Sequence, residues 1–221
     1  MTTIRFKFKR ENRLRFISHL DQQRLFQRAF RRAAIPIAYS SGFNPHPKLS
    51  FALAMSVGMV SDGEYGDVVL AETMDLKVFL EKLNAALPEG IHVVEAQVLP
   101  PKAPSLTASL KSCTYRVQIK CAETINTQMI NDVFSKFLSR FEIMTEKRNK
   151  KGKMVLKNIR PFIEELRLIE ILDKKAIIEM KLNYIEQQSV KPEIVLSAVN
   201  EQKYCFEIDP IMVIRRTTMQ I

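Results

Sequence analysis

A proline-rich run, PPKAPS at residues 100–105, divides the 221-residue chain into two parts of similar length. Proline fixes its own backbone and restricts the residue before it, so such a run is typical of a connector. Each part has about 100 residues, which is enough for one domain with its own hydrophobic core. We therefore expect two domains, residues 1–102 and residues 103–221.

The first part has the pattern of an α+β fold. Apolar residues at positions 4, 6 and 8 alternate with cationic ones at positions 5, 7 and 9, which predicts a strand with one apolar face. A helix capped by Ser18 is expected to run to about Ala34, because Pro36 cannot continue it. Strands at 49–57 and 64–72 predict a hairpin with its turn at 61–63, before a helix at 75–87 and a strand at 91–99. The order β-α-β-β-α-β is that of a ferredoxin-like module.

The second part repeats this order of elements. A strand at 113–121 and a helix at 129–141 come first, and strands at 165–172 and 176–184, a helix at 192–200 and a strand at 211–216 follow. Between them, residues 141–159 predict a β-hairpin with Asn149–Gly152 at its tip. The predicted fold class is therefore α+β, with two ferredoxin-like (βαββαβ) modules, the second carrying an inserted β-hairpin.

Positive charge is concentrated in the first quarter of the chain. Residues 1–50 contain 11 Lys and Arg against 2 acidic residues, whereas the remaining residues contain 23 against 22. This asymmetry favours a surface that faces a polyanion, with nucleic acid as the leading candidate. The alternative is a solvated basic face that aids solubility.

The first predicted helix provides candidate phosphate contacts. A helical wheel places its apolar residues on one arc and four arginines on the opposite side. Guanidinium groups suit bidentate contacts with phosphate, although a solvated helix face is the alternative. The four residues are Arg24, Arg28, Arg31 and Arg32.

The loop YSSGFNPHPK, residues 39–48, follows this helix and is predicted to be stiff because it contains two prolines. Such a preformed loop would lose little entropy on binding. Its aromatic side chains could stack on bases, its amide could bond a base edge and its lysine could meet phosphate. The alternative is that Phe43 fills the core and the prolines brace a turn. The candidates are Tyr39, Phe43, Asn44, His46 and Lys48.

Two lysines at the tip of the predicted hairpin, Lys150 and Lys151, form a second candidate contact with nucleic acid.

Catalytic candidates are restricted to His19 and His46, since no metal-binding or nucleotide-binding motif is present. With these motifs absent, we expect no metal and no cofactor in this chain. Cys113, Cys121 and Cys205 are odd in number and form no C-x-x-C pair, so we expect no disulfide framework and no closed zinc site, which favours a reducing compartment. No apolar run is long enough to span a membrane and no signal peptide is recognisable, so a cytoplasmic location is expected.

The motifs SHLD, YSSGFNPHPK and the pair Glu64-Tyr65 lie in residues 13–70, a segment that resembles a bacterial radical-SAM-associated family, the domain of unknown function 2344. The resemblance covers most of the chain. It implies a radical-SAM enzyme as partner on a separate chain, which would carry an iron–sulfur cluster and S-adenosylmethionine. The element order also looks like the paired modules of CRISPR repeat-processing endoribonucleases, which is an analogy of fold alone.

These observations favour an RNA-binding accessory protein that works with a separate radical-SAM enzyme in RNA modification. Two alternatives stay open. One is an adaptor that binds the enzyme without touching RNA. The other is a metal-independent endoribonuclease in which His19 or His46 acts as general acid–base.

Overall fold

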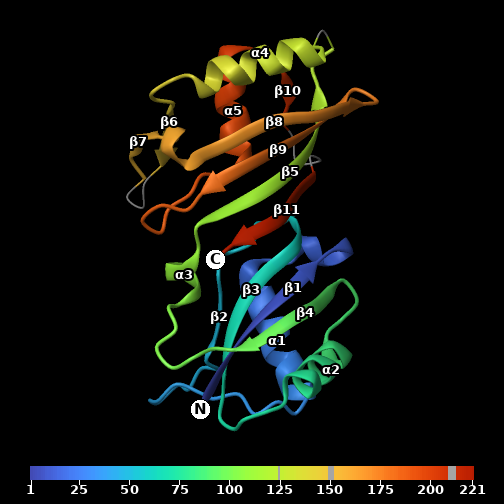
Figure 1. Cartoon of the computed structure of the whole chain (residues 1–221), viewed down its shortest axis with the longest axis vertical. Coiled ribbons are helices and arrows are strands. Elements are labelled where there is room, and N and C mark those ends of the chain that lie inside the picture. The colour runs from blue at the N-terminus through green and yellow to red at the C-terminus, as the bar shows by residue number, and fades with distance from the viewer. Residues whose placement is uncertain (124, 149–151, 209–212) are drawn as a thin grey trace. The chain divides into compact units, whose positions relative to one another are not determined.

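The chain forms two compact units in the computed structural model, which describes residues 1–123, 125–148, 152–208 and 213–221. Unit 1 comprises Met1–Leu110 and Ile221, and unit 2 comprises Lys111–Gln220. Helices and antiparallel strands make up both units, so the fold is α+β (Figure 1). Among the described helices, none is long and apolar enough to cross a membrane.

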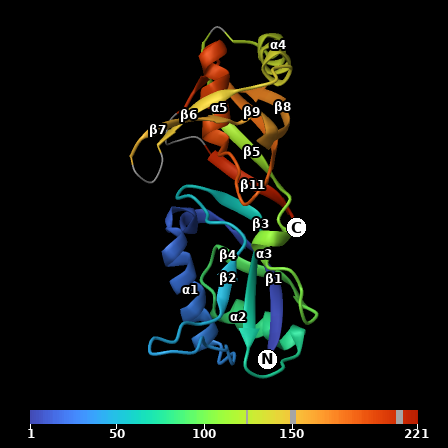
Figure 2. The same cartoon turned by 90° about the vertical axis from the view of Figure 1, so that its left-hand side faces the viewer.

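Unit 1 contains an antiparallel sheet in the order β4-β1-β3, with β2 paired to the β3 strand. Two helices lie on one face of this sheet, and Figures 1 and 2 show α1 behind the strands in one view and beside them in the other. The elements are β1 (Thr2–Arg10), a 3₁₀ helix (Asn12–Phe16), α1 (His19–Arg32), β2 (Leu49–Phe51), β3 (Val60–Leu70), α2 (Leu76–Ala86), β4 (Ile91–Val98) and α3 (Leu106–Ser109).

The core of unit 1 is built from the apolar face of β1. Phe6 and Phe8 are fully buried and their rings lie 5.6 Å and 4.8 Å from the ring of Phe26 in α1. Phe6 pairs with Gly66 across the β1–β3 ladder. A Cβ atom at position 66 would come within 2.4 Å of the Phe6 ring, so glycine is required there for the ring to cross the neighbouring strand. The strand predicted from period-two alternation is thereby confirmed.

The hairpin predicted from residues 49–57 and 64–72 is confirmed, because β2 and β3 pair antiparallel, but its predicted turn at residues 61–63 is wrong. Ser61 and Gly63 lie inside β3, and β2 ends at Phe51 rather than continuing to residue 57. The physical reason is Arg10, whose buried guanidinium donates hydrogen bonds to the carbonyl oxygens of Ser56 and Met59, both at 3.0 Å. A buried cation needs such acceptors, so residues 52–59 leave the sheet to supply them.

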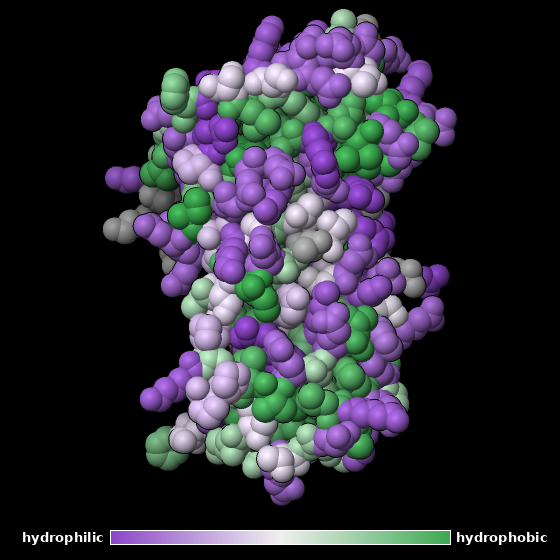
Figure 3. Space-filling view, viewed as in Figure 1, coloured by the Kyte–Doolittle hydropathy of each residue, from purple (hydrophilic) through white to green (hydrophobic). Residues whose placement is uncertain are grey.

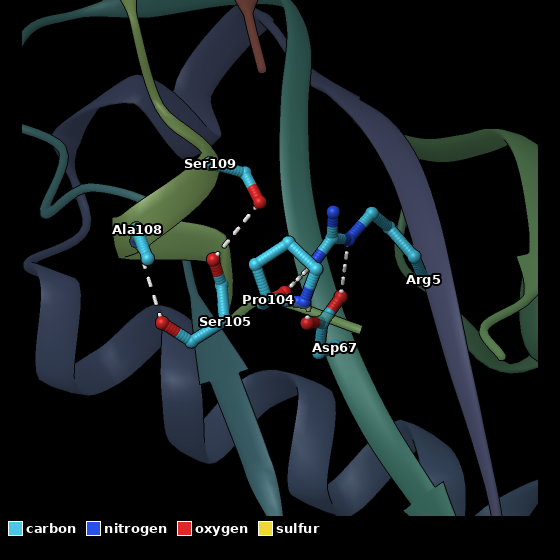
Figure 4. A network of polar contacts seen from close by, with 6 residues as sticks. All are labelled: Arg5, Asp67, Pro104, Ser105, Ala108 and Ser109. Carbon is cyan, nitrogen blue, oxygen red and sulfur yellow. Dashed lines mark hydrogen bonds and ion pairs between the residues drawn. The ribbon is translucent and has the colours of Figure 1, made fainter. Parts of the chain in front are cut away.

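The proline-rich run lies within unit 1 and is tied to its sheet (Figure 4). Arg5 donates two hydrogen bonds of 2.9 Å to the carboxylate of Asp67 on β3 and one of 3.1 Å to the carbonyl oxygen of Pro104. Ser105 then caps α3 by accepting a hydrogen bond from the amide of Ala108. This bidentate ion pair is largely buried, which fixes the run against β1 and β3.

Unit 2 contains an antiparallel sheet in the order β11-β5-β9-β8, with β10 paired to β5, and a separate two-stranded sheet of β6 and β7. Its elements are β5 (Ser112–Cys121), α4 (Thr127–Leu138), β6 (Met144–Arg148), β7 (Met154–Asn158), a 3₁₀ helix (Arg160–Phe162), β8 (Ile163–Leu172), β9 (Lys175–Asn183), α5 (Pro192–Gln202), β10 (Phe206–Glu207) and β11 (Val213–Gln220).

The elements predicted for the second part are confirmed where the structure describes them, apart from small shifts in their bounds. The buried face of β5 holds Cys113, Tyr115, Val117, Ile119 and Cys121, as the alternation predicts. In Figure 3, hydrophilic residues cover the outward side of α4 and apolar residues lie below it, at the level of β8. Among the described elements, α3, β10 and the two 3₁₀ helices have no counterpart in the predicted order, because each is too short to show a period.

Candidate functional site

A groove lined by arginines runs along α1 in unit 1. Its volume is about 310 Å³, and its walls are formed by Ile17, Asp21, Arg24, Leu25, Arg28, Arg32 and Pro88. The three arginines are four residues apart, so they project from the same side of the helix. Their side chains are on the exposed face, opposite the buried Phe26 and Phe30. The structure therefore brings three of the four predicted arginines together in one cationic groove.

The start of α1 determines where this groove begins. Ser18 caps the helix by accepting a hydrogen bond of 3.1 Å from the amide of Asp21, and its hydroxyl donates one of 2.6 Å to the Asp21 carboxylate. This second hydrogen bond lowers the pKa of Asp21, and the charges of Arg24 and Arg28 lower it further. Asp21 is therefore charged at neutral pH and lies 3.6 Å from the guanidinium of Arg24.

The last two arginines of α1 differ in their surroundings. Arg32 lines the groove and donates a hydrogen bond of 2.6 Å to the carbonyl oxygen of Ala86, the last residue of α2. Its guanidinium therefore also ties α1 to α2. Arg31 is exposed but does not line the groove. Arg31 thus offers the same charge on the same helix outside the candidate site.

The loop at residues 39–48 is closed at its base. Tyr39 and Pro47 form an isolated β-bridge, and Ser40 and His46 exchange two hydrogen bonds of 2.8 Å and 2.9 Å. Gly42 has a φ of +120°, a value that L side chains rarely adopt. The loop is therefore held as one compact turn by its own contacts and its glycine.

The side chains of this loop point away from the core. All residues from Ser41 to His46 are exposed, and Phe43 is fully exposed. The alternative in which Phe43 fills the core is therefore wrong. Lys48 is exposed as well, and Tyr39 is 47% exposed. None of these side chains is among those that line the arginine groove, so the two predicted contact surfaces are separate features of unit 1.

His19 lies beside a buried polar cluster that the sequence pattern did not predict. Arg10 is fully buried, and its guanidinium also donates to the side-chain oxygen of Gln22 at 3.0 Å. Glu64 is also buried. It lies in the same region, because its charge raises the pKa of His19 while the charge of Arg10 lowers it. The alternation in the sequence could have predicted the burial of Arg10, because Arg10 follows Phe6 and Phe8 on the buried face of β1.

Burial lowers the pKa of His19 from its ordinary value of 6.5, and the positive charge of Arg10 lowers it further, whereas Glu64 acts in the opposite direction. His19 is therefore a neutral imidazole at pH 7. Its Nδ1 atom is buried and has no hydrogen-bond partner among the described residues. His46, by contrast, lies in the exposed loop.

Lys150 and Lys151 lie outside the described residues, between the β6 and β7 strands. Cys113, Cys121 and Cys205 are buried reduced thiols, and burial raises the pKa of Cys121 and Cys205. Across the described ranges, no group of three or more His, Cys, Asp or Glu side chains is arranged to hold a metal ion.

The fold and this site define an α+β protein of two compact units with a cationic groove along its first helix. A family model described as an uncharacterised protein conserved in bacteria, the domain of unknown function 2344, matches residues 3–192. The chain belongs to this family, which confirms the family part of the resemblance found from the sequence motifs. The association with radical-SAM enzymes stays a prediction.

Comparison with other proteins adds a likeness of fold. None of the curated proteins matches the sequence. Among solved structures, a chain of the crystal structure of a Cbf5-Nop10-Gar1 complex is similar, with 8% sequence identity and a TM-score of 0.52. The similarity covers 97% of this chain and 48% of that chain, so this chain spans about half the length of that relative. At this identity the likeness shows the fold alone.

Proposed function

We propose that this protein is a cytoplasmic RNA-binding accessory protein that works with a radical-SAM enzyme on a separate chain, in RNA modification. The observation that carries the proposal is the groove in which Arg24, Arg28 and Arg32 stand in one row. Arginine binds phosphate with a planar, bidentate set of donors, so a row of exposed guanidiniums suits a phosphate backbone.

The charge distribution supports an anionic ligand for this groove. The groove contains three cations and one carboxylate, that of Asp21. The excess charge of the chain is concentrated in residues 1–50, with 11 Lys and Arg against 2 acidic residues. Such a surface raises the local concentration of a polyanion and speeds its association.

In this proposal the loop at residues 39–48 meets exposed bases. Phe43, Asn44 and His46 are exposed on a closed loop, so little ordering is needed before they contact a ligand. The exposed aromatic ring of Phe43 offers a stacking surface that any base can use. Tyr39 and Lys48 would add a second ring and a cation at the base of the loop.

The partner enzyme carries the chemistry in this proposal. It would hold the iron–sulfur cluster and S-adenosylmethionine, while the present chain holds the RNA. This role of the partner enzyme rests on the family resemblance.

We also propose a specific fold for each unit. Each is a ferredoxin-like module, and the β6–β7 hairpin is an insertion between α4 and β8 of the second module. The matching strand orders β4-β1-β3 and β11-β5-β9 support it.

A second candidate function, metal-independent RNA cleavage, is favoured by the buried Nδ1 atom of His19, which has no hydrogen-bond partner among the described residues. A neutral imidazole at pH 7 can accept a proton, which is the role of a general base. His46, exposed in the loop, is the alternative candidate for this role. Wild-type protein that cleaves RNA in the presence of a chelator, and loses this activity in His19→Ala, would favour this function over the accessory role.

The proposal is tested by reversing one charge inside the groove and one outside it. We expect Arg28→Glu to weaken RNA binding by about tenfold or more, because it removes a phosphate contact and adds repulsion. Arg31→Glu changes the same charge on the same helix outside the groove, so it should weaken binding clearly less than Arg28→Glu does. Gel-shift titration of a bacterial RNA pool with both variants measures the difference.

Two results would contradict the proposal. Equal losses in the two variants would mean that only net charge attracts the RNA and that the groove is not its site. Absence of RNA binding by the wild-type protein would favour the adaptor, which binds the enzyme without RNA.

A further inference from the structure

We infer that the groove takes a single-stranded segment of RNA and that Phe16 stacks on a base at the end of the groove nearest the start of α1. This inference rests on the proposed function and specifies the class of RNA and the orientation of its contacts. It is carried by the spacing of the arginines, the size of the groove and the exposure of Phe16.

The spacing of the arginines suits successive phosphates of one strand. Residues four apart in an α-helix are separated by about 6 Å along its axis. Arg24, Arg28 and Arg32 therefore form a straight row with this repeat. An extended single strand presents phosphates at a comparable repeat and can follow a straight row, whereas the strands of a duplex curve away from it.

The size of the groove also favours a single strand. Its volume of about 310 Å³ matches part of a nucleotide chain, and its walls come only from residues 17–32 and Pro88 rather than from a broad surface. Proteins that read duplex RNA do so by spanning many base pairs across a broad surface, about 16 base pairs in the best-known module. Single-strand binders instead combine a cationic groove with aromatic side chains beside it.

Phe16 supplies the aromatic side chain. It is the last residue of the 3₁₀ helix before α1 and is 58% exposed. Its neighbour in sequence, Ile17, lines the groove, so the backbone of Phe16 lies at the groove's end, although its ring is not among the side chains that line the groove. The guanidinium carbon of Arg15 lies 4.6 Å from the centre of the Phe16 ring. A ring already held by a cation is a prepared stacking surface for a base.

The two ends of the groove differ in chemistry, and this difference sets the orientation of the bound RNA strand. The end near the start of α1 holds Ile17 and Asp21, an apolar side chain and a carboxylate. A carboxylate repels phosphate but accepts hydrogen bonds from base amino groups. The end near the last turn holds Arg28 and Arg32. The base therefore lies by Phe16 and Asp21, and the phosphates lie by Arg28 and Arg32.

The test compares a short single-stranded oligoribonucleotide with the same sequence in a blunt duplex, by fluorescence anisotropy. We expect the wild-type protein to bind the single strand at least about tenfold more tightly. Phe16→Leu keeps apolar bulk but removes the ring, so it should weaken single-strand binding by about fivefold to a hundredfold. Phe16→Tyr should retain binding.

Leu20→Ala is the matched control. Leu20 lies in the first turn of α1, is 61% exposed and is not aromatic, so its loss should change binding by no more than about twofold. Equal binding of duplex and single strand, or equal effects of Phe16→Leu and Leu20→Ala, would overturn the inference while leaving RNA binding intact. If the wild-type protein bound neither oligonucleotide, the proposed function itself would be wrong.

Discussion

Arg10 is the residue that does most to determine the local structure around the start of α1. Its guanidinium is fully buried and donates to the carbonyl oxygens of Ile17, Ser56 and Met59 and to the side chain of Gln22. A buried charge is tolerated only when hydrogen bonds replace its hydration. These bonds join β1, the start of α1 and the segment before β3, and they place His19 at the edge of the cluster.

His19 should make the stability of the protein depend on pH. In the unfolded chain its imidazole takes up a proton as pH falls through its ordinary pKa of 6.5, whereas in the folded chain the lowered pKa delays protonation. The unfolded state then binds more protons, so the free energy of unfolding falls below about pH 6.5. We expect the wild-type melting temperature to fall more steeply than that of His19→Gln between about pH 8 and about pH 5.

His19→Asn serves as a second, non-titrating variant in the same measurement. Thermal melting of all three proteins across the pH series separates the effect of His19 from that of the carboxylates, which titrate in each. Parallel curves for wild type and both variants would show that His19 does not resist protonation in the folded state.

At the scale of elements, α1 was predictable and the region from β2 to β3 was not. The cap at Ser18, the apolar arc and the stop at Pro36 are local signals, and the helix follows them closely from His19 to Arg32. The predicted turn at residues 61–63 failed because long-range contacts outweighed local ones. Ser61 is fully buried and pairs with Arg10, a contact that no local pattern of turn residues reveals.

The stiffness of the loop at residues 39–48 can be tested without disturbing the core. Replacing Pro45 and Pro47 with glycine should increase the number of conformations that the loop adopts without RNA. Binding would then lose backbone entropy worth on the order of 1 kcal/mol for each replaced residue. RNA affinity should therefore fall by about tenfold or more, while the melting temperature changes little. Anisotropy titrations and thermal melts of the double variant measure the two effects.

Phe43→Ala is the companion variant for this loop. Because Phe43 is fully exposed, its removal should change the free energy of unfolding by less than about 0.5 kcal/mol. A loss of RNA affinity with unchanged stability is expected if the ring stacks on a base. Proline variants that melt early and yet bind RNA normally would show that the loop only braces the fold.

At the scale of the whole molecule, the order of elements in each unit could be predicted, but the placement of functional side chains could not. Periodicity fixes which face of a strand or helix is apolar, and it correctly separated the arginine face of α1 from its buried face. It could not show that Arg31 lies outside the groove or that Pro88 completes it, because these depend on packing between elements distant in sequence.

RNA binding in the groove depends most on Arg28 contacting a phosphate, and the salt dependence of binding tests this contact directly. Each phosphate neutralised by a cation on a single strand contributes about −0.7 to the slope of log K against log salt. Arg28→Gln should therefore make the slope shallower by about 0.7, and Arg31→Gln should leave it unchanged. An unchanged slope in Arg28→Gln, or equal changes in both variants, would contradict the assignment of the groove as the RNA site.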